Sequence, residues 1–219
     1  MKKLLVIPVF ALVSVFALNA FAQSSEEKLN EILTKMELSD KKITTAEITY
    51  SQEIFYSATN ETQKITGNLK YKKPDSIFIV QKMPQEQRIY IDGKKITVYT
   101  PDNSQAVIDN WKNMINGEFT PTSMVNFGGN WKTISKDNNI SYVGEDDKNY
   151  IISISPAKKN EWNMQMHIDK ESMRPSKAIV TAAGLIVNVN LTQYTINQNF
   201  KKDIFKFTAP EGVEIIQLN

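Results

Sequence analysis

Few residues in this chain have the types and spacing that enzyme chemistry needs. His167 is the only histidine among 219 residues, so a catalytic triad lacks a matching set of partners and a metal centre lacks the usual second imidazole. The chain contains no cysteine, which excludes a thiol nucleophile, a disulfide and a zinc ribbon. We therefore expect His167 to be an ordinary strand residue.

Two further patterns have a chemical interpretation that their surroundings do not support. Glu145-Asp146-Asp147 could offer carboxylates to calcium, but it lacks the spacing of a calcium loop, and we expect a solvated turn between strands. Gly128-Gly129 is not followed by the Lys-Ser/Thr pair of a phosphate-binding loop. The sequence predicts no catalytic residue, no metal and no cofactor, and we expect no enzyme; a hydrolase with an unrecognised site is the remaining alternative.

Residues 1–22 are typical of a cleaved export signal. Lys2 and Lys3 precede an apolar run over residues 4–18, and Ala20-Phe21-Ala22 is a small-residue cleavage site. A membrane helix is the alternative, but the run is short for spanning a bilayer. Without a cysteine, lipid cannot be attached to the new N-terminus through a thiol. We expect residues 23–219 to form one domain that is free in the compartment across the membrane.

The charge balance argues against nucleic acid as a partner. The chain has 26 basic and 24 acidic residues, and the signal segment removes Lys2 and Lys3 and no acid. The mature chain is then formally neutral, which gives no support for a basic surface that binds nucleic acid or anionic membrane.

One amphipathic helix is expected at the start of the mature chain. A capping signal at residues 24–27 precedes apolar residues with i, i+3, i+4, i+7 spacing, and the pattern ends near Ser39. The apolar residues are Leu29, Ile32, Leu33 and Met36.

From residue 46 onward the apolar period changes from helical spacing to two, which predicts strands. Tight turns at Asp92-Gly93 and Ala183-Gly184 join pairs of them, and no long helical crossover separates the others, so we expect an antiparallel meander. The expected strands span residues 46–56, 65–71, 77–83, 88–91, 96–101, 140–143, 150–155, 162–168, 177–182 and 185–195.

Residues 111–131 break the strand pattern. We interpret this apolar segment as two short helices, because Gly117 and Pro121 interrupt it and Gly128-Gly129 ends it. Together with the N-terminal helix, this segment is the only helical material able to cover the apolar face of a single sheet.

Lys73 has two interpretations. It continues the inward-facing row of Gly67, Leu69 and Tyr71 by two positions, which directs a cation toward an apolar face where it needs partners such as backbone carbonyls. Alternatively, Pro74 ends the strand and Lys73 reaches solvent.

Several segments, in order, resemble the LolA family of periplasmic lipoprotein carriers. They are Tyr50-Ser51-Gln52, Gly67-Asn68-Leu69 with Lys73-Pro74, "DGKKITVYTP" at residues 92–101 and "FKFTAPEGVEI" at residues 205–215. The resemblance extends from about Thr44 onward. It implies a mainly β fold with helices: an incomplete antiparallel β-barrel (LolA/LolB-like) with a hydrophobic cavity covered by a helical lid.

The resemblance also implies the residues of the binding site. In the family, the position of Lys73 is typically an arginine that contacts the lid backbone and holds it closed; lysine lacks the planar five-donor fork of arginine. Methionine and isoleucine side chains suit a cavity for variable acyl chains, although gap-filling in an ordinary core is the alternative. The residues expected to line the cavity are Ile48, Tyr50, Ile65, Leu69, Tyr71, Ile77, Ile79, Met114, Ile115, Phe119, Met124, Val125, Trp162, Met164 and Met166.

The function that the resemblance implies is lipoprotein transport. A monomeric periplasmic chaperone would take acylated lipoproteins from a lipoprotein-releasing ABC transporter of the inner membrane. It would shield their acyl chains and deliver them to the outer membrane or to an acceptor lipoprotein there. The alternative is a lipid or lipopeptide sensor of the cell envelope on the same fold.

Overall fold

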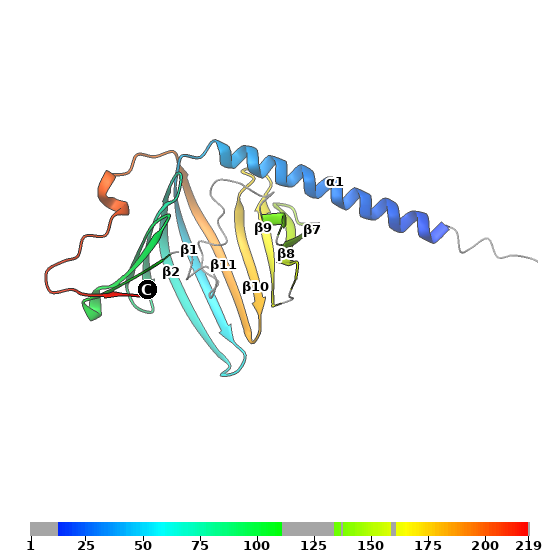
Figure 1. The fold of residues 1–219 in the computed structure, drawn as a ribbon. Coiled ribbons are helices and arrows are strands. Elements are labelled where there is room, and N and C mark those ends of the chain that lie inside the picture. Colours follow the sequence, from blue (N-terminus) through cyan, green and yellow to red (C-terminus); the bar gives the residue numbers. More distant parts are fainter. Residues whose placement is uncertain (1–12, 111–133, 137, 159–160, 219) are drawn as a thin grey trace, which may run out of the picture.

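A long helix lies across one end of a large curved sheet (Figure 1). The computed structural model describes residues 13–110, 134–136, 138–158 and 161–218. The helix is α1 (Val13–Lys41), and short 3-10 turns are η2 (Pro101–Asn103) and η3 (Lys202–Phe205). The strands are β1 (Thr45–Tyr56), β2 (Glu61–Lys72), β3 (Ser76–Met83), β4 (Gln87–Asp92), β5 (Lys95–Thr100), β6 (Gln105–Asn110), β7 (Asn138–Glu145), β8 (Asn149–Pro156), β9 (Trp162–Asp169), β10 (Pro175–Ala182), β11 (Leu185–Ile196) and β12 (Glu214–Gln217).

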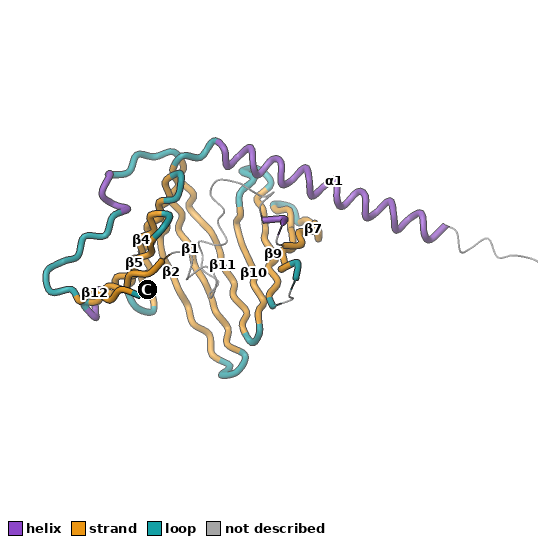
Figure 2. The backbone as a smooth tube through the Cα atoms, in the orientation of Figure 1, coloured by secondary structure: helices purple, strands orange, loops and turns teal. Residues whose placement is uncertain are grey.

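The sheet has twelve strands in the order β12-β6-β5-β4-β3-β2-β1-β11-β10-β9-β8-β7. Two meanders therefore meet at β1, which pairs with β2 on one side and β11 on the other. β7 and β12 end the sheet without pairing with each other, so the expected incomplete barrel is confirmed (Figure 2).

Two strands were missed by the sequence patterns. β6 is six residues long and ends in Asp109 and Asn110, and β12 is four residues long. β12 pairs with β6 in parallel, with Ile215 opposite Ala106, so the expectation of a purely antiparallel sheet was wrong at this edge. β6 and β12 are about a hundred residues apart in the chain, so no local turn in the sequence indicates that they pair.

The expected boundaries of the N-terminal helix were also wrong. α1 begins at Val13, runs through the capping signal of residues 24–27 and ends at Lys41 rather than near Ser39. Residues 13–22 are rich in Ala and contain no Gly or Pro, so no helix-breaking residue ends the helix before residue 24. Two residues of the predicted apolar stripe are buried, since Ile32 and Met36 are each only 1% exposed.

Alternate residues of β1 face the core, as the period of two predicts. Ala46, Ile48 and Tyr50 are buried, and the residues between them are partly exposed. They join one continuous cluster with α1 residues and with inward residues of β2, β3 and β8–β11. We call this side of the sheet the inner face.

The C-terminal segment covers part of the opposite, outer face. The ring of Phe207 lies 5.5 Å from the rings of Tyr90 and Tyr99, and Phe78 lies 4.8 Å from Tyr90. η3 contacts β3 and β4. The chain therefore passes from β11 over the outer face before β12 pairs with β6.

In the part of the chain that the structure describes, no helix combines the length and the apolar composition needed to cross a membrane.

Candidate ligand-binding face and its helix anchor

The inner face brings together the predicted cavity residues that the structure describes. Strand register places Ile48 opposite Leu69 and Leu69 opposite Ile79, so these three side chains form a row across β1, β2 and β3. Ile48, Tyr50, Leu69, Tyr71, Ile79, Met164 and Met166 belong to the buried cluster, and Ile65, Ile77 and Trp162 pack against it. Met114, Ile115, Phe119, Met124 and Val125, with the whole expected lid of residues 111–131, lie outside the described residues. Contact with acyl chains stays a prediction for all of them.

Further residues of the same face were not among the predicted cavity residues. They lie on strands that the patterns did predict, and alternate positions of those strands would have identified them. α1 also contributes two buried residues to the face. The additional buried residues are Ile32, Met36, Ile152, Ile154, Ile168, Ala178, Val180, Val187, Val189 and Leu191.

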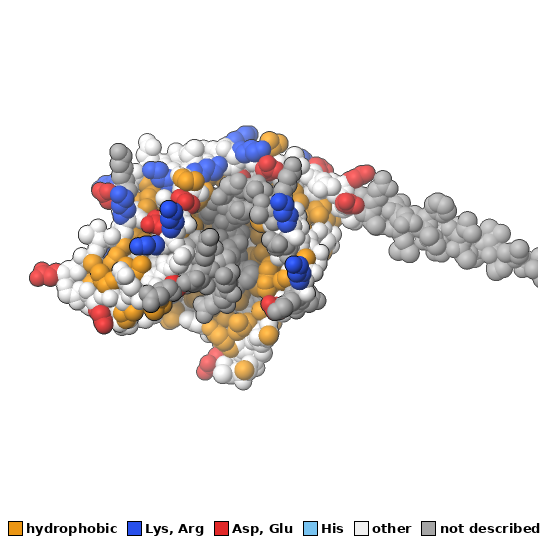
Figure 3. All heavy atoms as spheres, viewed as in Figure 1, with side chains coloured by type: hydrophobic (Ala, Val, Ile, Leu, Met, Phe, Trp, Pro, Cys, Tyr) orange, Lys and Arg blue, Asp and Glu red, His pale blue; other side chains and the backbone are white. Residues whose placement is uncertain are grey.

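The space-filling view shows how apolar side chains are distributed around this face. Hydrophobic side chains gather on both sides of its central part and at its lower end, with Lys and Arg side chains among them (Figure 3). A groove of about 410 Å³ lies between α1 and β7, and its walls include Leu29, Leu33 and Ile140 together with the polar Asn30 and Glu37.

Gln52 is the exception on the apolar inner face. It is 5% exposed, and its cross-strand neighbours are Ile65 on β2 and Val189 on β11. Its side-chain oxygen Oε1 is buried and has no hydrogen-bond partner among the described residues. A buried acceptor left unpaired costs about 1–3 kcal/mol, so the residue is not explained by stability.

Lys73 fastens the C-terminal end of α1 to the sheet. Its ammonium Nζ donates to the backbone oxygen of Asp40 at 2.8 Å and lies 3.5 Å from that of Lys41, while its backbone N–H donates to Thr44 at 2.9 Å. The last carbonyls of a helix have no partners within it and carry the negative end of its dipole, so a cation is stabilising there. The Lys73 ammonium therefore has a backbone partner on α1, while its side chain remains partly exposed. Its described partner is α1, and any contact with residues 111–127 lies outside the described residues.

Asp40 and Arg174 complete the anchor. Burial raises the pKa of the Asp40 carboxyl to about 6, although the nearby charges of Lys73 and Arg174 favour its ionised form. The Arg174 guanidinium lies 5.9 Å from the ring centroid of Tyr194, and its Nε is buried without a hydrogen-bond partner among the described residues. The Tyr194 hydroxyl donates to the Pro175 carbonyl at 2.8 Å. α1 therefore ends between two cations, one from each half of the sheet.

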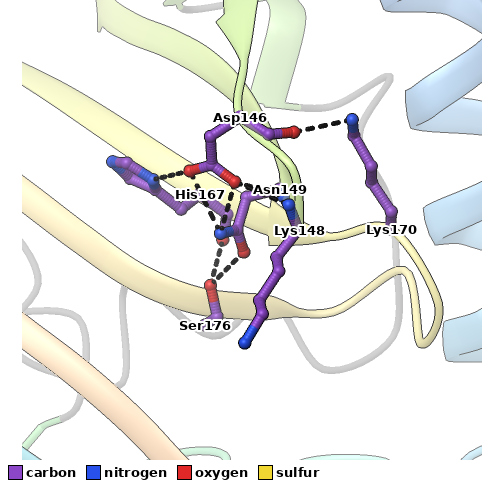
Figure 4. Close-up of polar contacts among 6 residues, drawn as sticks. All are labelled: Asp146, Lys148, Asn149, His167, Lys170 and Ser176. Carbon is purple, nitrogen blue, oxygen red and sulfur yellow. Dashed lines mark hydrogen bonds and ion pairs between the residues drawn. The ribbon is translucent and has the colours of Figure 1, made fainter.

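The acidic run at residues 145–147 forms a turn. Asp146 Oδ1 accepts the backbone N–H groups of Lys148 and Asn149 at 2.8 and 2.7 Å, which is the expected solvated turn (Figure 4). No cluster of three or more His, Asp or Glu side chains able to hold a metal ion occurs among the described residues.

His167 lies on β9 beside this turn. Its Nδ1 is 3.9 Å from Asp146 Oδ2, and burial, followed by the charge of Lys177, lowers the pKa of its imidazole. The nearby Ser176 hydroxyl donates to Asn149 Oδ1 at 2.8 Å and also lies 3.3 Å from the backbone oxygen of His167. The serine thus contacts the backbone of His167 rather than its ring, and this geometry does not activate a nucleophile.

An open, mainly antiparallel sheet with an apolar inner face, crossed by a helix, defines the open-barrel architecture of this chain. The chain belongs to the LolA family: residues 41–208 match the family described as "Outer membrane lipoprotein carrier protein LolA".

Two relatives by sequence have the same description as this family, and one solved structure has a similar fold. An outer-membrane lipoprotein carrier protein of Pasteurella multocida is 26% identical over 208 residues, which cover 94% of this chain and 93% of that protein. One from Pseudomonas entomophila is 24% identical over 207 residues, covering 94% and 96%. The fold resembles an uncharacterized conserved protein from Thermus thermophilus at a TM-score of 0.59 and 12% identity, covering 87% of this chain and 99% of that one.

Proposed function

We propose that the protein is a periplasmic carrier that shields the acyl chains of lipoproteins and delivers these lipoproteins to the outer membrane. The observation that carries the proposal is the single apolar inner face, which runs from β3 through β1 to β8 and is open at the sheet edges. A carrier, rather than an enzyme, is also what the family description names.

The energetics of acyl chains explain why such a face is needed. Each buried CH₂ contributes about 0.8 kcal/mol, so a multiply acylated protein leaves a membrane extremely slowly unless a soluble partner offers comparable apolar surface. Met164 and Met166 supply flexible apolar side chains that can adapt to chains of differing length, beside the apolar side chains of Ile48 and Leu69.

Loading requires the covering helix to move. Ile32 and Met36 of α1 are buried in the same cluster that the acyl chains would use, so chains can enter only where the helix yields. We propose that Lys73 acts as the latch of this lid, with residues 111–127 as its second part. A contact formed by one ammonium group is strong enough to hold the closed state and weak enough to be exchanged for ligand.

Export and partners follow from the same role. Residues 1–22 would be removed as a signal, which shortens α1 at its N-terminal end, and the mature chain would work as a monomer. It would receive cargo from a lipoprotein-releasing ABC transporter and pass it to the outer membrane or an acceptor there.

The proposal is tested by purifying the protein from its native periplasm and identifying bound molecules by mass spectrometry of the intact complex and of its organic extract. Co-purified acylated proteins, lost from an inner-face variant such as Ile77→Glu, are the expected result. Free lipid without protein would instead favour a lipid sensor, and an empty inner face in cells rich in lipoprotein would contradict both.

A further inference from the structure

Gln52 is a polar residue in the middle of an otherwise apolar surface. It lies on β1, at the junction of the two meanders, and points to the same face as Tyr50 and Ile54. Its cross-strand neighbours on both sides are apolar, and it is 5% exposed. A residue that served only to pack this face would be apolar.

Other glutamines on neighbouring strands show what a structural role looks like. Gln63 Oε1 accepts a hydrogen bond from the Tyr56 hydroxyl at 3.0 Å, and Gln193 Oε1 accepts one from the Thr49 hydroxyl at 3.1 Å. In contrast, Gln52 Oε1 is buried with no donor among the described residues. The Gln52 oxygen is thus an acceptor available to a ligand on the inner face.

The neighbouring Tyr50 does not fill this need. A Cβ atom built on Gly67 would lie 2.6 Å from the Tyr50 ring, so the ring lies directly against the backbone of β2. The Tyr50 hydroxyl does not donate to the Gln52 oxygen, which has no hydrogen-bond partner in the described part of the chain. The Gln52 oxygen therefore lacks a donor even though the Tyr50 side chain lies on the same face, two residues away.

The chemistry of the acceptor narrows the ligand class. A hydrocarbon chain brings no hydrogen-bond donor, and an ester linkage brings only acceptors, whereas an amide linkage carries an N–H next to the acyl carbonyl. We propose that Gln52 is a specificity-determining residue that accepts a hydrogen bond from the N–H of an amide-linked acyl chain. The inference rests on the proposed function and deepens it: it names an N-acyl group as the feature that the inner face recognises.

A matched pair of probes isolates this hydrogen bond. One is an N-palmitoyl peptide, and the other is its depsipeptide twin, in which an ester oxygen replaces the N–H of the acyl amide. Dissociation constants are measured for the mature wild-type protein, for Gln52→Met and for Gln165→Met. Gln165 is a matched control because it is an exposed glutamine of β9, between Met164 and Met166. Methionine keeps the length of glutamine and removes its amide.

We expect wild type and Gln165→Met to bind the amide probe about tenfold more tightly than the ester probe, the ratio typical of one buried hydrogen bond. Gln52→Met should bind both probes equally, at the affinity of wild type for the ester. Its thermal midpoint should be unchanged or higher, because the buried Oε1 that the substitution removes has no hydrogen-bond partner among the described residues. A lower midpoint would show that Gln52 is structural and overturn the inference.

The remaining outcomes separate this inference from the proposed function. Equal binding of both probes by wild type, or a preference that survives in Gln52→Met, overturns the role of Gln52 and leaves the carrier function intact. Failure of wild type to bind either probe contradicts the carrier function itself.

Discussion

The ammonium group of Lys73, on the loop after β2, donates a hydrogen bond to the backbone oxygen of Asp40 in the last turn of α1, across 2.8 Å. This contact joins the covering helix to the half of the sheet that carries Leu69 and Tyr71. Ile32 and Met36 connect the same helix directly to the ligand-binding face, because both belong to its buried cluster.

Replacing Lys73 with leucine should loosen this end of α1. A hydrogen bond to a charged group contributes about 1.5–3 kcal/mol, and the low end applies because Lys73 is half-exposed. We expect amide hydrogen exchange at residues 38–43 to quicken about tenfold, cargo uptake to persist and hand-off to membranes to slow.

Lys73→Arg is the matched variant for this latch. Arginine keeps the cation and adds a planar set of donors, so it should retain transfer and slow the exchange of the same amides. Transfer rates that are equal for wild type and Lys73→Leu would end the latch hypothesis.

Asp40 should make the stability of the anchor depend on pH. Its folded pKa of about 6 lies above the ordinary value of 3.8, because burial penalises the ionised carboxylate. The protonated Asp40 carboxyl therefore contributes to folding stability fully below about pH 4, and this contribution is lost as the pH rises through 6. Asp40→Asn should raise the thermal midpoint at pH 7.5 and leave it nearly unchanged at pH 4.

Asp146 offers a control of opposite sign. Its carboxylate accepts backbone N–H groups of the turn, and these hydrogen bonds lower its pKa. The stabilising effect of this carboxylate should be present above pH 3.8 and lost below it. If the thermal midpoint of Asp40→Asn equals that of wild type at every pH, ionisation of Asp40 does not lower the stability of the anchor.

A charge on the inner face should abolish ligand binding. Ile77 lies opposite Tyr71 and Ile91 and packs against the buried cluster. Ile77→Glu would place an unpaired carboxylate where acyl chains are expected. The carboxylate can keep part of its hydration in the ligand-free protein, but a bound acyl chain would remove this water at a high desolvation cost. The variant should fold, as judged by circular dichroism, and bind an acylated lipoprotein at least tenfold more weakly. Unchanged affinity would show that the ligand uses another surface.

Gly67→Ala tests the packing of Tyr50 against β2. An added Cβ would lie 2.6 Å from the Tyr50 ring, so the ring or the strand must move. Overpacking of this kind typically costs about 1–3 kcal/mol of unfolding free energy, measurable by urea denaturation. The double variant Gly67→Ala, Tyr50→Leu should recover part of that loss, since leucine vacates the space; a purely additive result would contradict the proposed contact.

The sequence patterns located most strands because alternate burial is a local property. The period of two predicted the strand that carries Ile48 and Tyr50, whereas the register that sets Ile48 opposite Leu69 was not predicted and comes from the structure. The joining of β1 to β11 and of β6 to β12 depends on segments far apart in the chain, for which no local signal exists.

The site was predictable to a similar extent. The inward direction of Lys73 followed from the spacing of β2, but its partner, the Asp40 carbonyl, depends on where α1 ends and how it crosses the sheet. Gln52 lies at a buried position of the strand that the period of two predicted over residues 46–56. That its side-chain oxygen has no donor among the described residues becomes visible only when the neighbours from β2 and β11 are known.

The central claim, that the inner face carries acyl chains, is tested most directly by a transfer measurement. Vesicles loaded with a fluorescent triacylated lipoprotein are mixed with mature protein, and the lipoprotein that remains in the supernatant is counted after the vesicles are sedimented. With wild-type protein, soluble lipoprotein should appear in an equimolar complex and pass on to added acceptor vesicles, whereas Ile77→Glu should leave it in the pellet. Soluble lipoprotein in equal amounts with wild type and Ile77→Glu, or none with wild type, would contradict the claim.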